Sequence, residues 1–238
     1  MDKVRKGTLY LIPSFLGESQ VEAVFPSINK EIISKIRYFI VEEVRTARRF
    51  LKKVCPEIEI DKLTFTLYNE HSSTNDVSEF LEPTMKGEDT GIISEAGTPC
   101  VADPGSLIVK LAHESGIRVS PMTGPSSLLL ALMASGFNGQ QFAFLGYLPI
   151  DKSARSKKIR EIELDIYKKD QTQIFIETPY RNLQLFQALT DTCQESTLLC
   201  MATSLTTTEE SILTLSIKEW KKRKPYINKK PVVFLLYR

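Results

Sequence analysis

The residues best suited to hold a ligand lie in a segment rich in glycine, proline and polar side chains, residues 93–105. Its sequence is Ile-Ser-Glu-Ala-Gly-Thr-Pro-Cys-Val-Ala-Asp-Pro-Gly. An apolar run typical of a strand precedes the segment, and the helix-like run 106–112 follows it. Such a helix begins with free backbone N–H groups at the end of the strand, where an open α/β sheet binds its ligand. The alternative is a turn-rich connection without a ligand.

A second segment of the same kind, Met-Thr-Gly-Pro-Ser-Ser, occupies residues 122–127. It opens the apolar helix expected over residues 128–135, which Gly136 ends in the manner of a C-cap. Gly124 permits close approach of another backbone, and two hydroxyl groups follow it at the start of the helix. The alternative is that both serines are ordinary helix caps. Two such segments this close in sequence favour a ligand site over a chance arrangement of turns.

The elements that must position these segments predict an α/β protein with two α/β domains. Up to residue 121, short strands alternate with helices, which indicates a mostly parallel sheet with helices on both faces. After residue 121 the strands become longer and more alternating, which indicates a mixed sheet with helices. We expect an N-terminal domain over residues 1–118 and a C-terminal domain over 122–238. The two segments would then face each other across an interdomain cleft, a favoured place for a ligand or cofactor. The expected strands are 8–13, 37–41, 63–67, 91–94, 118–121, 141–146, 172–177, 197–203, 211–215 and 231–237, and the expected helices are 44–54, 75–85, 106–114, 128–135, 153–167 and 182–191.

The composition is that of an ordinary globular protein, with 238 residues, 42% of them hydrophobic and 25% charged. The net charge of +2 does not mark a general polyanion binder. Basic residues nevertheless cluster in three places, at 45–53, at 152–160 and at 218–230, where seven Lys or Arg accompany one acid. These clusters fit phosphate contacts, and solvated helix faces produce the same pattern.

The four cysteines have no C-x-x-C spacing and no companion histidines. This pattern argues against a zinc site and a disulfide framework and predicts a reducing, cytoplasmic location. The N-terminal residues do not follow the pattern of a signal peptide, and no apolar run approaches the length of a membrane span. We therefore expect a cytoplasmic protein with no metal and no membrane partner.

A series of short motifs runs in order along nearly the whole sequence. They are Gly7-Thr-Leu-Tyr-Leu-Ile-Pro13 with Gly17, Glu42-Glu-Val-Arg45, Ser94 to Gly105, Gly124-Pro-Ser-Ser127 with Ser135-Gly136, Phe144-Leu-Gly-Tyr-Leu-Pro149, Arg155, Ile176-Glu-Thr-Pro-Tyr-Arg181, Thr203-Ser-Leu-Thr206 and Glu209-Glu210. Together they resemble the tetrapyrrole methylase superfamily, the class III S-adenosylmethionine methyltransferases. Within it they are most similar to the branch that 2′-O-methylates a ribose in small-subunit ribosomal RNA.

The sequence departs from that branch at a few positions. Glu95 stands where the branch has Asp, and Cys100 stands where it has Gly. Leu205-Thr206-Thr207 replaces Leu-Thr-Lys, and Lys229-Lys230 replaces the Gly-Glu before the last strand. The sequence ends at Arg238, so we expect a short form without the extra C-terminal domain of some relatives. These changes bear on the choice of methyl acceptor more than on binding of the donor.

The resemblance implies a bound S-adenosylmethionine cofactor, with a wall contributed by each domain. From the first domain it implies Pro13, Gly97, Thr98, Val101 and Asp103, and from the second Ser126, Ser127, Tyr147, Leu148 and Pro149. Two of these residues have an equally simple structural explanation. Asp103 would serve as an N-cap for the helix that follows it, and Tyr147 would belong to the core.

Methyl transfer to a ribose hydroxyl needs alignment of donor and acceptor and a group that takes the proton. Alignment supplies about 7–11 kcal/mol, and a proton acceptor adds roughly 10²–10⁴-fold. The acids expected to act as catalytic base are Glu43 and Glu177, with His71 as a third choice; a positional role is the alternative for each. Arg45, Arg155 and Arg181 are the residues expected to bind the phosphate or ribose of the substrate.

The resemblance also implies partners. We expect ribosomal RNA or the small ribosomal subunit as substrate, and a homodimer, since relatives are dimeric and apolar residues gather around Phe137, Phe142 and Phe144. Two other functions fit the same cofactor. One is C-methylation of a tetrapyrrole or corrinoid, or alkylation of a protein histidine. The other is a module that binds S-adenosylmethionine without chemistry. Against a tetrapyrrole, Gly97-Thr98-Pro99 stands where those enzymes have Gly-Asp-Pro.

Overall fold

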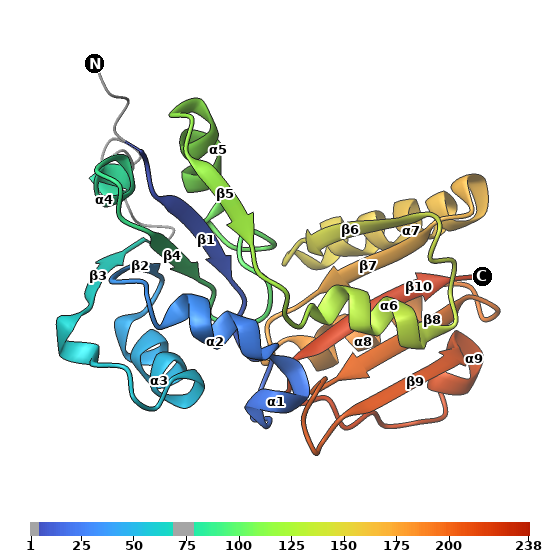
Figure 1. Ribbon diagram of the computed structural model, residues 1–238. Coiled ribbons are helices and arrows are strands. Elements are labelled where there is room, and N and C mark those ends of the chain that lie inside the picture. Colours follow the sequence, from blue (N-terminus) through green and yellow to red (C-terminus); the bar gives the residue numbers. More distant parts are fainter. Residues whose placement is uncertain (1–4, 69–78) are drawn as a thin grey trace. The chain divides into compact units, whose positions relative to one another are not determined.

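A computed structural model describes residues 5–68 and 79–238 of the chain. The chain divides into two compact units, Met1–Pro125 and Ser126–Arg238, each with a sheet of its own (Figure 1). The division falls a few residues after the expected boundary between 118 and 122. The physical reason is that strand β5 (Arg118–Pro121) pairs with β1 (Thr8–Ile12) and so completes the sheet of the first unit.

The first unit contains a five-stranded sheet with the order β3-β2-β4-β1-β5. Every neighbouring pair in it is parallel. Its other strands are β2 (Tyr38–Val41), β3 (Thr64–Leu67) and β4 (Thr90–Ile93). Its helices are α1 (Val21–Val24), α2 (Ser27–Ile33), α3 (Val44–Val54), α4 (Glu82–Met85) and α5 (Ser106–Glu114), with short 3₁₀ turns η1 (Ile60–Lys62) and η3 (Glu79–Leu81).

Side chains of the first sheet alternate between two apolar clusters, because successive residues of a strand point to opposite faces. On β1, Tyr10 and Ile12 belong to the cluster formed with α1, α2 and α3. Leu9 and Leu11 belong to the cluster formed with α5 and η3. Helices therefore cover both faces of this sheet, as the buried parallel strands require.

The second unit contains a mixed sheet with the order β6-β7-β10-β8-β9. Only β6 and β7 run parallel, and the other neighbours are antiparallel. The strands are β6 (Phe142–Tyr147), β7 (Thr172–Ile176), β8 (Leu198–Thr203), β9 (Ser211–Ser216) and β10 (Val232–Tyr237). The helices are α6 (Ser127–Ser135), α7 (Lys152–Lys169), α8 (Asn182–Thr192) and α9 (Ile217–Trp220).

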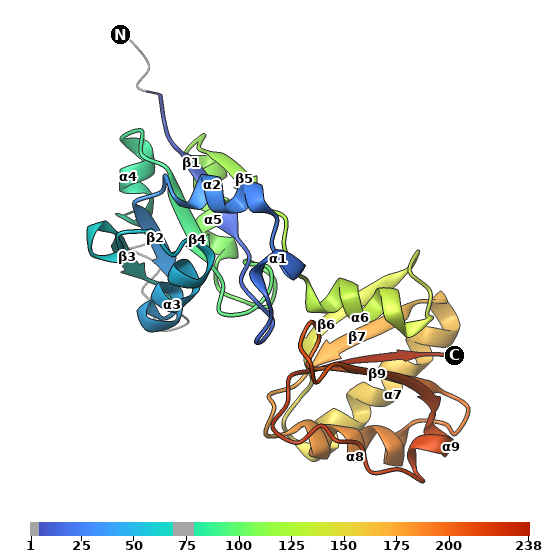
Figure 2. The same ribbon diagram turned by 60° about the horizontal axis from the view of Figure 1, so that its bottom comes forward.

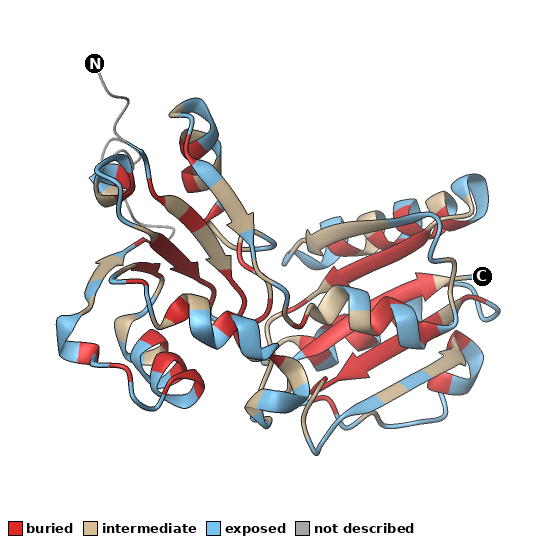
Figure 3. Cartoon of the chain, in the orientation of Figure 1, coloured by how far each residue is buried: buried red, intermediate tan, exposed pale blue. Residues whose placement is uncertain are grey.

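The large core of the second unit lies between its sheet and helices α7, α8 and α9. Phe175 of β7 and Phe234 of β10 stack there with their ring centroids 6.0 Å apart. Helix α6 lies on the opposite face, where it contacts β8, β9 and β10 (Figure 2). The three inner strands are mostly buried, whereas the edge strand β9 alternates between exposed and half-buried residues (Figure 3).

The predicted fold class is confirmed, with one parallel and one mixed sheet in an α/β protein. The helix expected over residues 75–85 differs in its described part, which is the 3₁₀ turn η3 followed by the short helix α4. Residues 75–78 lie outside the described residues. Three short helices were not predicted, α1, α2 and α9. Within residues 5–68 and 79–238, no helix combines the length and the apolar composition that crossing a membrane requires.

Candidate functional site

The carboxyl ends of the parallel strands bring the predicted turns of the first unit to one edge of its sheet. Ile93 pairs with both Ile12 and Val41 in the strand register. Pro13, Ser94 and Glu42 directly follow these residues and therefore lie along that edge. Ligands of open α/β sheets bind at this edge, so the structure places the 93–105 segment where its sequence predicted.

The turn after β1 packs directly against the second glycine-containing segment. A methyl group built on Gly124 would lie 2.2 Å from Cγ of Pro13 and 2.7 Å from its Cβ. Hydrogen bonds hold the segment on both sides of this contact, from Met122 N to the carbonyl of Leu11 (2.9 Å) and from Asn29 Nδ2 to the carbonyl of Thr123 (2.7 Å). Glycine is thus required at 124 for the close approach that its sequence suggested.

Three residues of the 93–105 segment have left-handed backbone conformations, Gly97 (φ 74°), Cys100 (φ 67°) and Ala102 (φ 61°). Asp103 holds this conformation, because its Oδ1 accepts hydrogen bonds from the backbone N–H groups of Cys100 and Gly105, each at 2.8 Å. The N-cap of α5 is Gly105, with no side-chain cap. Asp103 therefore organises the turn and does not cap the helix.

Two residues that stand where the resembled branch has glycine adopt left-handed backbone conformations. Cys100 has φ 67° and Lys229 has φ 58°, the region in which glycine is most comfortable. For a residue with a side chain this conformation costs about 1–2 kcal/mol. The Cys100 thiol is also partly buried beside Asp103, which raises its pKa to about 12. Both positions therefore have a backbone conformation that glycine would adopt at lower cost.

A hollow of about 510 Å³ adjoins this edge, between the strand ends and helix α3. It is lined by Ser14, Phe15, Gly17, Glu18, Thr46, Ala47, Arg49, Phe50, Lys53, Ile93, Ser94 and Glu95. The buried Ser14 Oγ has no hydrogen-bond partner among the described residues. Its backbone N–H and the Ser94 hydroxyl both donate to the carbonyl of Gly97, at 2.9 Å and 2.6 Å. The hollow therefore offers two cationic side chains to a polar ligand, and the unpartnered Ser14 hydroxyl is buried in its wall.

Glu95, which lines the hollow, and the nearby Glu43 have pKa values that are shifted in opposite directions. Glu43 is the N-cap of α3 and accepts hydrogen bonds from Arg45 N (2.8 Å), Thr46 N (2.7 Å) and Thr46 Oγ1 (2.7 Å). These bonds, that of the Thr46 hydroxyl foremost, lower the pKa of Glu43. Partial desolvation raises the pKa of Glu95, and the nearby Glu43 carboxylate adds to the effect. Glu95 is thus the better proton acceptor, although the sequence marked it only as a departure.

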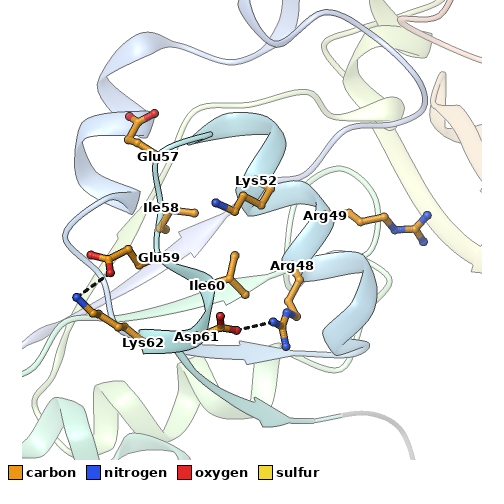
Figure 4. Close-up of a pocket in the computed structure, with 9 residues that line it drawn as sticks. All are labelled: Arg48, Arg49, Lys52, Glu57, Ile58, Glu59, Ile60, Asp61 and Lys62. Carbon is orange, nitrogen blue, oxygen red and sulfur yellow. Dashed lines mark hydrogen bonds and ion pairs between the residues drawn. The ribbon is translucent and has the colours of Figure 1, made fainter.

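A larger hollow, about 650 Å³, lies between α3 and residues 57–62 (Figure 4). Its charges largely neutralise each other, with Arg48 Nη2 2.9 Å from Asp61 Oδ1 and Lys62 Nζ 2.7 Å from Glu59 Oε2. Arg49 points away from these pairs and also lines the smaller hollow. The basic cluster at 45–53 is therefore partly a paired surface and partly a wall of the smaller hollow.

In the second unit, Ser126 occupies the N-cap position of α6 and Ser127 is its first residue. The Ser126 side chain makes no capping hydrogen bond, so capping does not account for its hydroxyl. Tyr147 at the end of β6 is 55% exposed and is not a core residue. The Leu148 side chain is buried in the core, so a ligand could contact only the backbone groups of this residue. Pro149 is half-buried.

Glu177 follows β7 and is 5% exposed. Its Oε1 accepts hydrogen bonds from Thr178 N (2.7 Å) and from Arg181 Nη2 (2.7 Å) and Nε (3.1 Å). Its Oε2 is buried with no partner in the described structure, and so is the hydroxyl of Thr206. The register joins Ile176 and Ala202 to Val233, so residues 177 and 204–206 follow the ends of β7 and β8, the two strands on either side of β10. This edge therefore carries polar atoms that await a partner.

The arginines expected to bind substrate differ in their availability. Arg45 is exposed, whereas Arg181 is held by Glu177. Arg155 is only 7% exposed, and its Nη1 donates to the carbonyl of Ile150 at 3.4 Å. His71 lies outside the described residues. No three His, Cys, Asp or Glu side chains of the described chain group closely enough to hold a metal ion.

Solved structures with the same fold cover nearly the whole chain. The methyltransferase CobJ has a TM-score of 0.64 at 16% identity, over 97% of this chain and 99% of CobJ. Uroporphyrin-III C-methyltransferase from Thermus thermophilus, solved in complex with S-adenyl homocysteine, has a TM-score of 0.57 at 13% identity, over 98% of both chains. The chain thus shares the fold of these methyltransferases.

Curated relatives narrow this class. Ribosomal RNA small subunit methyltransferase I of Haemophilus influenzae is 32% identical over 97% of this chain and 78% of its own length. The protein of the same name from Vibrio cholerae is 28% identical over 89% of this chain and 69% of its own length. No protein-family model matches the sequence. The chain belongs to the ribosomal RNA small subunit methyltransferase I family and is a methyltransferase.

Proposed function

We propose that the protein uses S-adenosylmethionine to 2′-O-methylate a ribose of small-subunit ribosomal RNA. Its relatives are named for methylation of this RNA. A structure of the same fold holds S-adenyl homocysteine, the demethylated product of that cofactor. The observation that carries the proposal is the glycine-dependent contact of Pro13 with Gly124, next to the unpartnered buried hydroxyl of Ser14.

The residues present fit such a nucleotide. Its amino-acid and ribose groups need hydrogen-bond partners, and the buried Ser14 Oγ, Glu177 Oε2 and Thr206 Oγ1 have none within the described residues. Burial of a polar atom without a partner is costly, so a polar ligand that satisfies these atoms gains affinity. We propose that the cofactor is held by Pro13, Gly97, Thr98, Val101 and Asp103 of the first unit and Ser126, Ser127, Tyr147, Leu148 and Pro149 of the second.

S-adenosylmethionine supplies an activated methyl group on its sulfonium. The protein must align the acceptor hydroxyl and receive its proton. Glu95 is suited to receive the proton. Its pKa is raised toward neutral pH, which makes its carboxylate more basic than that of an ordinary glutamate, and its side chain lines the hollow. Glu43 and Glu177 are committed to hydrogen bonds within the protein, which favours positional roles for the two acids expected to be catalytic. Arg49 and Lys53 line the same hollow and would contact a phosphate.

Among the predicted substrate-binding arginines, Arg45 is free to contact RNA. Arg181 keeps one face available beside Glu177, with 31% of its side chain exposed. Burial of Arg155 favours a structural role in the loop that precedes α7. Ribosomal RNA or a small ribosomal subunit remains the proposed partner.

We further propose a cytoplasmic homodimer. Helix α6 is apolar all round, and such a helix is normally buried on all sides. Its Leu129 and Met133 are instead exposed, and Phe142 and Leu213 on the two edge strands of the same sheet are also exposed. A second copy of the chain would cover them. A sedimentation profile of monomer mass alone would refute this proposal.

The substrate is tested by incubating the protein with labelled S-adenosylmethionine and, in separate reactions, undermodified small subunits, free ribosomal RNA and a precorrin mixture. We expect label on a ribose 2′-oxygen of the subunit or its RNA. Label on the macrocycle alone would replace the proposed substrate with a tetrapyrrole. If calorimetry shows nucleotide binding but no methyl group is transferred to any of the three substrates, the protein is a binding module without catalytic activity.

A further inference from the structure

Two tyrosines stand out on the surface of the second unit. Tyr180, in the turn after β7, and Tyr226, in the loop between α9 and β10, are each 77% exposed. Neither side chain is part of the core, and an exposed aromatic ring is a large apolar area left in water. Both therefore require an explanation other than folding.

The loops that carry the two tyrosines are joined by hydrogen bonds. The N–H of Lys229 donates to the carbonyl of Pro179 at 3.1 Å. The Asn182 side chain, fully buried, donates through Nδ2 to the carbonyls of Lys230 (2.7 Å) and Ile227 (3.4 Å). The tyrosines thus lie on one continuous surface that is fixed before any partner binds.

Positive charge surrounds this surface. Lys230 Nζ lies 3.8 Å from the centroid of the Tyr226 ring and 3.2 Å from Glu209 Oε2. Four further cations of the loop are exposed and form no ion pair with any described residue, namely Lys222, Arg223, Lys224 and Lys229. In the other basic clusters, Arg48 pairs with Asp61 and Arg155 is buried.

We propose that this surface, formed by residues 179–181 and 222–230, binds a single-stranded segment of RNA. Bases stack on Tyr180 and Tyr226, and the unpaired cations contact the phosphates. Stacking tolerates any base, because every base has a π-face, and the fixed loops limit the ordering cost. An acidic protein would satisfy the cations and leave the rings unused. The inference rests on the proposed RNA substrate and extends the contact with RNA from the turn after β7 to the loop between α9 and β10.

The test compares full-length variants for binding a short fluorescein-labelled single-stranded oligoribonucleotide by anisotropy. Tyr226→Ala and Tyr180→Ala should each weaken binding roughly 5- to 100-fold, whereas Tyr226→Phe retains it. Alanine at the four unpaired cations should flatten the salt dependence of log K by roughly 0.7 for each phosphate that the protein no longer neutralises. Tyr167→Ala and Lys168→Ala, two exposed residues of α7, are the matched controls and should bind as the wild type does.

Each variant is also checked by thermal melting and by calorimetry with S-adenosylhomocysteine. Tyrosine-to-alanine variants that bind RNA as the wild type does would overturn the docking surface. Variants that lose affinity for S-adenosylhomocysteine but keep their affinity for RNA would also overturn it. Displacement of the RNA by polyglutamate as readily as by unlabelled RNA would also overturn it. If the tyrosine variants lose RNA binding while the wild type methylates no ribosomal RNA, the surface stands and the proposed substrate falls.

Discussion

Replacing Gly124 with alanine adds one methyl group at the contact between the turn after β1 and the segment 122–127. That methyl would lie 2.2 Å from Pro13 Cγ, far inside the 3.4 Å at which ordinary contact begins. One turn must therefore move by roughly 1 Å, although the proline ring is rigid and hydrogen bonds hold the Gly124 segment on both sides. Overpacking of this kind costs about 1–3 kcal/mol.

We expect two measurable results from Gly124→Ala. The melting temperature should fall by several degrees, and the Kd for S-adenosylhomocysteine by calorimetry should rise about 10-fold or more, since about 1.4 kcal/mol is tenfold in affinity. Gly139→Ala is the matched control, because a methyl group there has no neighbour within 4 Å. A folded Gly124→Ala protein with wild-type nucleotide affinity would refute a cofactor site at this contact.

Substitutions at Cys100, Glu177 and Glu95 test other parts of the site. Cys100→Gly should be more stable than Cys100→Ala by about 1 kcal/mol in urea, because only glycine is relaxed at φ 67°; equal midpoints would contradict this. Glu177→Ala should cost about 2 kcal/mol by leaving the partly exposed Arg181 and a backbone N–H without their acceptor. The loss of stability caused by Glu177→Ala should be smaller when Arg181 is also replaced with alanine. Strictly additive losses would contradict a stabilising interaction between the two side chains. Glu95→Gln should lower methyl transfer roughly 10²–10⁴-fold. Because the pKa of Glu95 is raised, its carboxylate becomes protonated at a higher pH than that of an ordinary glutamate, and the wild-type rate of methyl transfer should fall on acidification through that higher pKa. If Glu95→Gln shows the same fall of rate at low pH, Glu95 is excluded as the base.

Most of the fold could be predicted because its elements have clear hydrophobic periods. Helices α3 and α5 begin and end at the predicted residues. The short helices lacked such a signal. Helix α9 has a capping box, Ser216 with Glu219, which is readable in the sequence but stands at the start of a basic run interpreted as a surface patch.

The two glycine-containing turns could be located from the sequence, whereas the hydrogen-bonding roles of their residues could not. Glycine and hydroxyl spacing predicted both turns, since the backbone geometry is encoded locally. Whether Glu43 acts as a base or caps a helix depends on the rotamer of its side chain. In the structure its carboxylate accepts hydrogen bonds from the first backbone N–H groups of α3. The exposed Tyr226 was not singled out, because its surroundings are made by the turn after β7, nearly fifty positions away in the sequence.

The strand order also constrains how the chain acquires its shape during synthesis. Strand β1 is made before β4 and β5, yet it lies between them in the sheet, and Thr8 pairs with Arg118. Translation must therefore pass Pro121 before the first sheet can close, and the second sheet waits for β10, which lies between β7 and β8. Distant pairings of this kind form slowly and leave strand edges open meanwhile. A nascent chain of this protein should therefore depend on holding chaperones more than a helical protein of equal length does.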